Sequence, residues 1–248
     1  MNKVVIKKLL LIIILIYVGY IDAIFQPMVL DKYEHYNRSA YNLNSSFDNT
    51  LLKPTAVGYV KYIPSFIRKG ISNIFNNLHD FTSLFNDIFQ LSFRKSMSDL
   101  MRISINSTFG LAGLIDISSN LNLAQQNNTF GNTLKYYGWE SSQYFVIPFL
   151  GSSTIRDAIG LVPDLILNPT WWIIPYKYVY ISFGLFGLNL INKRSEYLKY
   201  DDVLDASLDP YLTIRNTYLN SIGEGMMMKK NVSDEVSIDD ILAEDKHN

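Results

Sequence analysis

The chain of 248 residues contains no cysteine. Disulfide bonds, thiolate metal sites and cysteine nucleophiles are therefore excluded, and so is the attachment of a lipid to a cysteine side chain. Charged residues are also scarce, at 18% of the chain, whereas a typical soluble domain has about a quarter. The formal net charge is −1. Since this charge balance offers no basic surface, we expect no nucleic-acid partner.

Patterns that carry catalysis are missing as well. The sequence has no P-loop and no G-x-G-x-x-G motif. None of the three histidines, His35, His79 and His247, stands at a metal-ligand spacing from another. Gly151 to Ser153 lacks the second glycine of the G-x-S-x-G nucleophile elbow. A hydrolase triad of Ser153, His79 and Asp157 stays open, because triads assemble in space. The sequence nevertheless favours a protein that is no enzyme and has no metal and no cofactor.

Apolar and aromatic residues are abundant. Hydrophobic residues make up 48% of the chain, which has 17 Tyr, 14 Phe and 3 Trp. With so few charges, much of the chain must face something apolar, either a protein core or lipid.

The two ends of the chain differ in composition from its middle. Residues 1–23 place three lysines before an apolar run from Leu9 to Val18 and end in Ala23, which is typical of a signal peptide. The alternative is an uncleaved anchor, although the run is shorter than the roughly 20 residues that span a bilayer. Residues 231–248 hold six acidic residues and no aromatic one, which predicts an acidic flexible tail. Residues 24–230 would then form one domain.

Residues 63–90 carry the clearest periodicity. Apolar side chains recur there at steps of three and four residues, and polar side chains fill the other face, which predicts an amphipathic helix. The ten apolar positions are Ile67, Ile71, Ile74, Phe75, Leu78, Phe81, Leu84, Phe85, Ile88 and Phe89. The polar segment NNLHD within it could divide the helix in two. Two interpretations stay open: a helix packed on a soluble core, or one lying in a membrane interface.

The rest of the chain predicts a mainly α protein. We expect a second helix at residues 93–105, a glycine-punctuated turn at 107–116 and a loop at 120–132. Residues 144–149 could be a strand or an apolar turn. Residues 170–192 form a long apolar stretch interrupted by Pro175, Lys177 and Asn189, which could be an embedded helix that does not span the membrane, a spanning helix or a core helix.

Several short motifs, in order and at matching spacing over about residues 31–219, resemble the MlaA (VacJ) family of phospholipid-handling proteins of the Gram-negative outer membrane. An acidic-then-N-R opening is followed by I-N-S-T-x-G-x-x-G-x-x-D at residues 105–116. Phe130-Gly131-x-Thr133-Leu134, a P-x-x-G-x-S-T-x-R-D segment at residues 148–157 and Asp209-Pro210-Tyr211 come next. Candidate residues for a lipid channel or for structural motifs are Asn37, Arg38, Asn44, Asn106, Gly110, Gly113, Asp116, Phe130, Gly131, Gly138, Pro148, Gly151, Arg156 and Asp157.

The chain also departs from the family's pattern. Lys32, Phe81 and Ser152 stand where prolines are usual, and Glu140, Ser142 and Gln143 occupy a stretch that is usually rich in glycine. The largest departure is the missing lipobox cysteine. The chain's own helices, or a retained signal segment, would have to hold it at the membrane.

The resemblance implies a ring of amphipathic helices around a central polar channel, lying in the periplasmic leaflet of the outer membrane. It also implies a function: phospholipids that stray into the outer leaflet pass through the channel to a periplasmic carrier of the MlaC type, which maintains lipid asymmetry. Family members commonly sit against a trimeric outer-membrane porin. The alternative is a scaffold that binds porin and carrier without conducting lipid.

Arg156 and Asp157 follow the apolar run Phe145 to Leu150. In one interpretation they turn toward the channel, because charges at membrane depth face a cavity or each other, and the arginine contacts a phosphate. In the other they fix neighbouring helices through salt bridges and caps. The second interpretation also applies to Asn37, Arg38 and Asn106.

Overall fold

The computed structural model describes residues 31–223, which are mainly helical and belong to one unit of the chain. The expected signal peptide and acidic tail lie outside the described residues, so both stay predictions. The α-helices are α2 (Glu34–Phe47), α3 (Lys53–Tyr62), α4 (Ser65–Phe89), α5 (Phe93–Thr108), α6 (Ile117–Asn120), α7 (Phe130–Tyr136), α8 (Ile155–Leu167), α9 (Val179–Tyr197), α10 (Asp201–Asp205) and α11 (Pro210–Ser221). Short π- and 3-10-helical turns are η1 (Asp48–Leu52), η2 (Pro169–Trp171), η3 (Tyr176–Tyr178) and η4 (Leu198–Tyr200).

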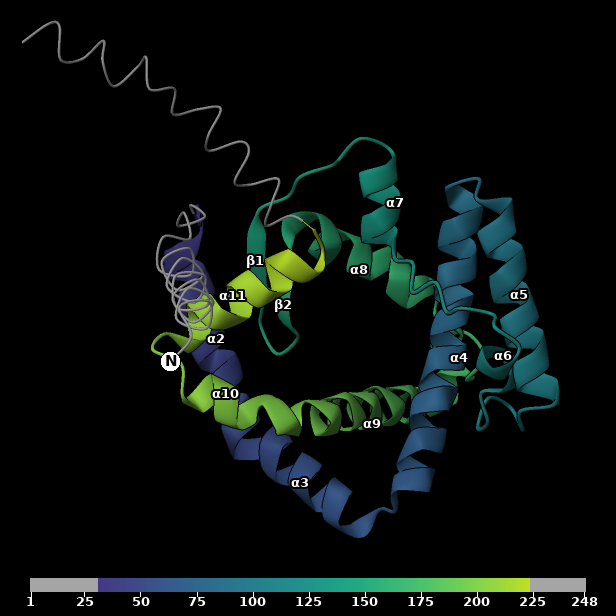
Figure 1. Ribbon diagram of the computed structural model, residues 1–248, viewed down its shortest axis with the longest axis horizontal. Helices are drawn as coiled ribbons and strands as arrows, with labels where there is room; N and C mark the ends of the chain where they lie inside the picture. The colour runs from purple at the N-terminus through teal and green to yellow at the C-terminus, as the bar shows by residue number, and fades with distance from the viewer. Residues whose placement is uncertain (1–30, 224–248) are drawn as a thin grey trace, which may run out of the picture. The chain divides into compact units, whose positions relative to one another are not determined.

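The elements of this unit contact one another in a closed circuit. Helix α4 packs on α8, α8 packs on the hairpin of β1 (Tyr144–Ile147) and β2 (Gly151–Thr154), and the hairpin packs on α2. The chain then runs from α2 through η1 to α3, which packs on α9, and α9 returns to α4. Figure 1 shows the same order of elements around a central gap. The described residues therefore form the ring of helices that the family resemblance implies.

Helix α4 is a single helix of 25 residues, and the segment NNLHD does not interrupt it. Its buried face is polar and its exposed face is apolar, the opposite of a helix on the surface of a soluble protein. The buried positions are Gly70, Asn77, Asp80, Thr82, Ser83, Asn86 and Asp87, and none of the ten periodic apolar side chains is buried. Ile88 and Phe89 are each 42% exposed. This arrangement argues against a helix whose apolar face covers a soluble core.

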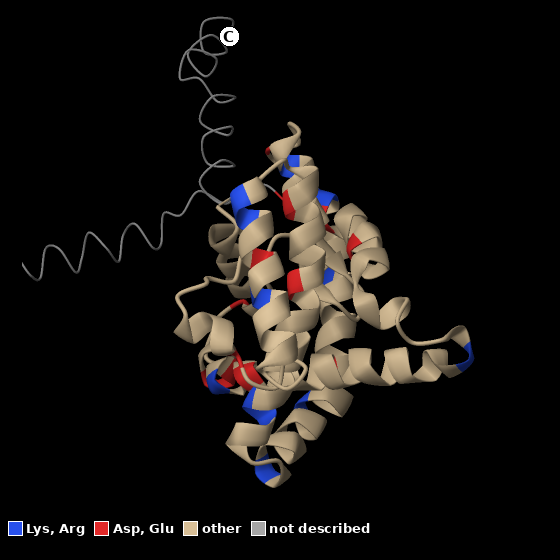
Figure 2. Cartoon of the chain, turned by 90° about the vertical axis from the view of Figure 1, so that its right-hand side faces the viewer, with Lys and Arg blue, Asp and Glu red and all other residues tan. Residues whose placement is uncertain are grey.

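Helix α5 repeats this inversion beside α4. Its buried positions are mainly polar, including Asp99, Arg102 and Asn106, whereas Phe93 and Met97 are largely exposed. Figure 2 shows the side of the molecule that carries these helices, where charged residues are few and scattered. The two helices meet through polar contacts and present apolar side chains outward.

The interior of the described unit is polar as a whole. Seven hydrophobic side chains are buried, compared with 22 polar or charged ones. A soluble domain buries mainly apolar residues and leaves charged ones outside. The low charge content of the sequence thus reflects an exterior that is mostly apolar.

Two parts of the fold differ from the sequence-based expectations. Of residues 144–149, the first four form β1 and the last two lie in the turn that follows, and the second strand, β2, was not expected. Its polar Gly-Ser-Ser-Thr sequence has no strand pattern, and it forms because β1 supplies its hydrogen-bond partners. Residues 170–192 divide among η2, which ends at Trp171, η3, which begins directly after Pro175, and α9.

The predictions for residues 93–132 agree with the structure in most of their bounds. The helix expected at 93–105 is α5, and the turn expected at 107–116 contains positive φ angles at Leu111, Ala112 and Gly113. The loop expected at 120–132 ends earlier, because α7 begins at Phe130, where the Thr129 side chain caps it. Among the described helices, none combines the length and the apolar character needed to cross a membrane.

Candidate functional site

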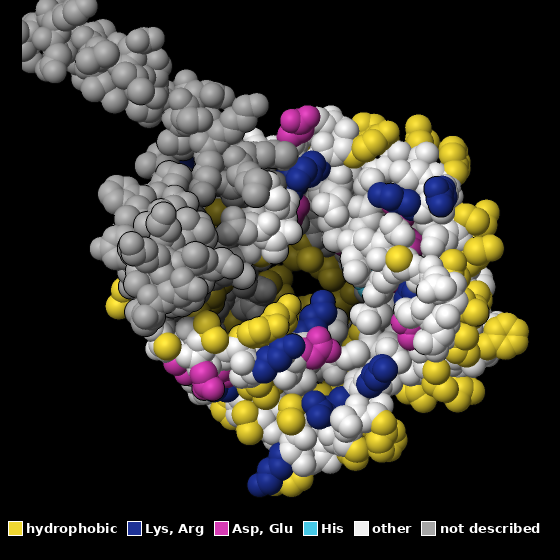
Figure 3. Space-filling model, in the orientation of Figure 1, with side chains coloured by type: hydrophobic (Ala, Val, Ile, Leu, Met, Phe, Trp, Pro, Cys, Tyr) yellow, Lys and Arg dark blue, Asp and Glu magenta, His cyan; other side chains and the backbone are white. Residues whose placement is uncertain are grey.

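Figure 3 shows a hollow within the described unit, surrounded by the ring of helices. Lys and Arg side chains gather at its edge over α9, and hydrophobic side chains are prominent along the outer edge of the molecule. Hydrophobic side chains are also visible around the hollow. The candidate site is therefore this hollow and the walls that bound it.

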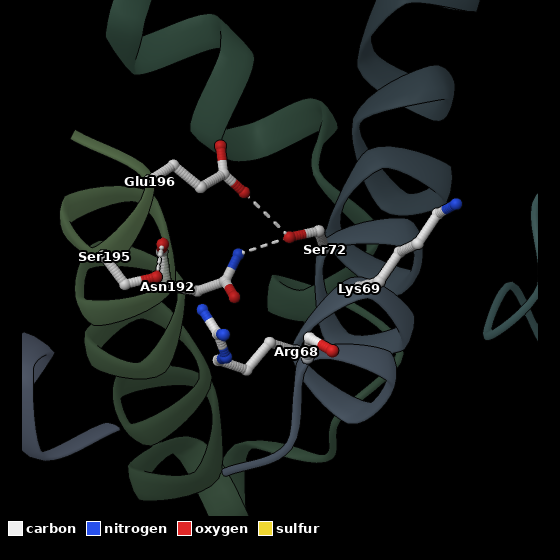
Figure 4. Close-up of a pocket in the computed structure, with 7 residues that line it drawn as sticks. Arg68, Lys69, Ser72, Asn192, Ser195 and Glu196 are labelled. Atoms are coloured by element: carbon white, nitrogen blue, oxygen red, sulfur yellow. Dashed lines mark hydrogen bonds between the residues drawn. The ribbon is translucent and has the colours of Figure 1, made fainter. Parts of the chain in front are cut away.

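The wall between α4 and α9 is held by a chain of polar contacts. Asn192 Nδ2 donates a hydrogen bond of 2.8 Å to Ser72 Oγ, and Ser72 Oγ donates one of 2.9 Å to Glu196 Oε1. Tyr59 of α3 donates a hydrogen bond of 3.0 Å to Asn192 Oδ1. An open pocket of about 260 Å³ lies between the two helices; it is lined by Ser65, Arg68, Lys69, Ser72, Asn192, Ser195 and Glu196 (Figure 4).

His79 lies further along α4, close enough to Lys193 of α9 to interact with it. Burial, together with the positive charge of Lys193, lowers the pKa of His79 to about 4. The imidazole is therefore neutral at physiological pH and adds no charge to this wall.

The contact between α4 and α5, on the side of α4 away from the central gap (Figure 1), contains buried carboxylates. Arg102 Nε pairs with Asp80 Oδ2 at 3.1 Å, and both side chains are at most 1% exposed. Asp99 lies near Asp87, and neither oxygen of Asp99 has a hydrogen-bond partner among the described residues. Burial, together with the negative charge of Asp87, raises the pKa of Asp99 to about 7. A proton on Asp99 at neutral pH would relieve the repulsion between these two acids.

Asp164 of α8 is a third buried carboxylate with an altered pKa. Burial raises its pKa to about 6, although hydrogen bonds from Asn86 and from the Phe130 backbone N–H oppose the rise. The two donors lie 2.9 Å from Asp164 Oδ1. Asp164 therefore joins α4, α7 and α8.

Three of the expected site residues lie on α2 and hold neighbouring elements. Asn37 is fully buried; it donates to Tyr144 O at 3.1 Å and accepts from Val146 N at 2.9 Å. Asn44 likewise binds both sides of the hairpin turn, at Ile147 O and Phe149 N. Arg38 pairs with Asp209 at 2.8 Å and stacks over the Tyr211 ring at 4.5 Å. These residues attach α2 to the hairpin and to α11.

Four more expected residues build the turn from α5 to α6. Asn106 Oδ1 accepts hydrogen bonds from Ile117 N and Ser118 N, each at 3.0 Å, and Asp116 caps α6 by accepting from Ser119 N. A Cβ at Gly110 would lie 2.2 Å from Ile115 O. Gly113 has a φ of +90°, and a Cβ there would approach Asn77 to 2.9 Å.

Arg156 and Asp157 stand at the first turn of α8. Arg156 is 1% exposed; its Nη1 donates to the carbonyls of Trp139 and Glu140 at 3.1 Å each, and its Nε pairs with Asp157. Asp157 also accepts from Thr154 Oγ1 at 2.8 Å. These contacts are those of the second interpretation, in which the two residues cap and join segments. No ligand role follows from them.

The remaining expected residues lie near α7 and in the hairpin turn. Phe130 packs its ring edge-on against Phe89, and a Cβ at Gly131 would lie 2.1 Å from Asp157 Oδ1. Gly138 and Gly151 have positive φ angles of +111° and +96°. Pro148 is exposed in the turn between β1 and β2. Whether any of the expected residues lines a lipid passage stays a prediction.

The sequence-based reasoning did not single out the Arg68–Glu196 pocket or the buried acids Asp80, Asp87, Asp99 and Asp164. The acids of α4 occur at positions 80 and 87, one heptad apart on its polar face, and this spacing was the available signal. Within residues 31–223, no group of three or more His, Asp or Glu side chains is arranged to hold a metal ion.

Comparisons with known proteins bear on the fold and its family. The family model "MlaA lipoprotein" matches residues 29–223. The chain is 30% identical over 220 residues to the "Intermembrane phospholipid transport system lipoprotein MlaA" of Haemophilus influenzae, covering 86% of each chain. It is 32% identical over 193 residues to the protein of the same name from Escherichia coli K12, covering 76% of this chain and 75% of that one.

A solved structure from work on the "Structural basis for maintenance of bacterial outer membrane lipid asymmetry" is similar with a TM-score of 0.64. The two sequences are 29% identical, and the match covers 80% of this chain and 99% of the other. An uncharacterised protein of Rickettsia bellii is 33% identical over 190 residues, covering 76% of this chain and 73% of its own. Together with the helical ring, these matches show that the chain belongs to the MlaA family.

Proposed function

We propose that this protein removes misplaced phospholipids from the outer leaflet of the outer membrane and passes them to a periplasmic carrier of the MlaC type, thereby maintaining lipid asymmetry. The lipid headgroup crosses through the hollow of the helical ring. No bond is made or broken in this process. Two relatives bear names of an intermembrane phospholipid transport system, which supports lipid transport as the general function.

The observation that carries the proposal is the inverted burial. Polar side chains of α4 and α5 are buried between the helices, and apolar side chains are left exposed. The polar side chains that face open space include Arg68, Ser72 and Glu196 of the α4–α9 pocket. A phosphate headgroup loses much free energy when it enters hydrocarbon without polar partners. A polar lining lets the headgroup cross while the acyl chains stay near the apolar rim.

The apolar exterior supports placement in the periplasmic leaflet without a cysteine-linked lipid. Helix α8 presents Ile159, Val162 and Ile166, which are 52%, 60% and 68% exposed. Each such side chain gains about 1.5–3 kcal/mol when it is fully buried in an apolar environment. Several of them together exceed the reversible anchoring that a single acyl chain provides. Part of this exterior would contact a trimeric porin.

Lipid asymmetry in cells tests the function. In a strain that lacks this chain, we expect outer-leaflet phosphatidylethanolamine to rise, as measured by labelling with a membrane-impermeant amine reagent, and we expect the intact gene to reverse the rise. A chain that binds porin and carrier in pull-down assays but leaves the outer-leaflet lipid unchanged would be a scaffold. Loss of Ser153 tests the hydrolase alternative, since Ser153→Ala would abolish any hydrolysis that depends on that hydroxyl.

The absence of cysteine allows a sharper test of conduction. A single cysteine introduced at Ser195, which lines the α4–α9 pocket, can be coupled to a bulky maleimide. Ser104→Cys, at an exposed position of α5, is the matched control. We expect the label at position 195 to stop lipid removal while binding to partners persists. The label at position 104 should leave lipid removal unchanged.

A further inference from the structure

We infer that the pocket between α4 and α9 binds a zwitterionic phospholipid headgroup, with the phosphate at Arg68 and the ammonium group at Glu196. This inference rests on the proposed function and names the lipid class that the site takes. According to this inference, the α4–α9 wall selects among lipid headgroups, which a polar surface without this charge pattern would not do.

Arg68 is free to bind an anion. Its Nε donates a hydrogen bond of 3.0 Å to Ile63 O, and its guanidinium makes no ion pair with a carboxylate of residues 31–223. Five other arginines do make one: Arg38, Arg102, Arg156, Arg194 and Arg215. In Figure 4, the Arg68 side chain reaches from α4 toward α9. The backbone contact thus fixes one edge of the guanidinium and leaves its other donors for a phosphate.

The surroundings of Arg68 strengthen the preference for a phosphate. Ser65 and Lys69 line the same pocket, and the positive end of the helix dipole of α4 lies at Ser65. The Lys69 side chain extends away from Arg68 (Figure 4), so it adds positive potential and no direct contact with the guanidinium.

Glu196 supplies the opposite charge across the pocket. It accepts a hydrogen bond of 2.9 Å from Ser72 and makes no ion pair with a lysine or arginine of the described part of the chain. A simple phosphate or an anionic headgroup would be repelled by this carboxylate. A headgroup that carries an ammonium group a few bonds from its phosphate satisfies both Arg68 and Glu196, and phosphatidylethanolamine has this chemistry.

Exposed apolar side chains beside the pocket favour a lipid over a free phosphate ester. Tyr62 and Phe66, on either side of the turn from α3 to α4, are 75% and 74% exposed, and Ile67 is 40% exposed. Tyr62 ends α3, and Phe66 and Ile67 lie in the first turn of α4, the turn that also carries Ser65 and Arg68 of the pocket. Acyl chains of a bound lipid have an apolar surface there.

The test measures binding to the purified full chain in detergent micelles. The probes are short-chain phosphatidylethanolamine, short-chain phosphatidylglycerol and inorganic phosphate. We expect the wild type to prefer phosphatidylethanolamine. Arg68→Gln should weaken the binding of both lipids about tenfold, and Glu196→Gln should weaken phosphatidylethanolamine alone about tenfold, since each removes a charge-assisted contact. Arg94→Gln, which removes an exposed charge from α5, should leave both affinities unchanged.

The inference is overturned if Arg68→Gln changes neither lipid affinity, or if Glu196→Gln affects the two lipids equally. It is also overturned if inorganic phosphate binds as tightly as phosphatidylethanolamine and competes with it, because the pocket would then be a site for free anions. Arg68→Lys provides a second variant that keeps the charge; we expect an intermediate loss, and circular dichroism verifies the fold of each variant. If the purified protein shows no headgroup preference but lipid removal in cells persists, this inference is rejected and the proposed function is retained.

Discussion

Arg102 of α5 and Asp80 of α4 form a buried ion pair in which Nε lies 3.1 Å from Oδ2. Asp80 is also held by Gln125 Nε2 at 2.9 Å, and Arg102 Nη1 donates to Leu123 O at 2.6 Å. The pair therefore connects two helices and the loop after α6. Burial removes both charges from water, so the attraction between them is needed to offset the free energy lost by desolvation.

Replacing Arg102 by methionine should destabilise the protein strongly. The change leaves the Asp80 carboxylate buried without its cation, which costs about 3–5 kcal/mol of unfolding free energy. Chemical denaturation in detergent measures the loss. Arg94→Met on the exposed surface of the same helix is the control and should change stability by less than about 0.5 kcal/mol. Adding Asp80→Asn to Arg102→Met should restore part of the loss, and a double variant no better than the single one would contradict the explanation.

The acid pair Asp87 and Asp99 predicts a stability that falls as pH rises. The folded protein holds the pKa of Asp99 at about 7, above the ordinary value for an aspartate, so the folded state binds the proton more tightly than the unfolded state. Stability from this proton is fully present below about pH 4 and is lost as pH rises through about 7. Asp99→Asn should therefore stabilise the protein at pH 8 relative to wild type and flatten the dependence between pH 5 and 8.

Asp164 contributes in the same direction, because its pKa is raised to about 6, so Asp99→Asn removes only part of the slope. Asp202→Asn, at an exposed position of α10, is the matched control and should leave the slope unchanged. His79 acts in the opposite direction, because its pKa is lowered to about 4, so the test compares the pH dependence of the wild type with that of Asp99→Asn. If the two proteins have the same slope between pH 5 and pH 8, Asp99 is ionised in the folded state.

Much of the helical fold could be predicted from the sequence, because periodicity reports the separation of apolar and polar faces. The helix expected over residues 63–90 is α4, within two residues at its N-terminal end and one at its C-terminal end. Periodicity alone did not say which face is inside, since the same pattern fits a soluble core and a lipid-facing helix. Burial of Asp80 and Asn86 with Phe89 exposed decides between them.

The site was less predictable, since it depends on contacts between distant segments. Asn37 and Tyr144 are 107 positions apart, and Ser72 and Glu196 are 124 apart. The motif residues could be identified through the family resemblance, but their contacts with backbone groups and caps required coordinates. The sequence gave no sign that Arg68 would line a pocket with a carboxylate of α9.

Gly131 and Gly187 should respond in opposite ways to alanine. A Cβ at Gly131 would lie 2.1 Å from Asp157 Oδ1, where α7 meets α8, so Gly131→Ala forces the helices apart and should cost about 1–3 kcal/mol. At Gly187, inside α9, nothing lies within 4 Å of an added Cβ, so alanine should stabilise the helix by about 0.5–1 kcal/mol. Thermal unfolding of the two variants measures the difference. Equal effects at both positions would mean that α7 and α8 are not in close contact.

The exposed apolar face of α8 should determine membrane attachment. Ile166 is 68% exposed, and if it lies in lipid, Ile166→Asp loses its apolar burial and forces the carboxyl group to move or to be protonated. We expect the partition coefficient into phospholipid vesicles, measured by flotation, to fall about tenfold or more, because about 1.5–3 kcal/mol of burial free energy is lost. Asn132→Asp adds the same charge at an exposed polar position of α7 and should partition like the wild type. Should Ile166→Asp float with the vesicles as fully as Asn132→Asp, this face of α8 does not contact lipid, and the membrane surface must be sought on α4 and α5.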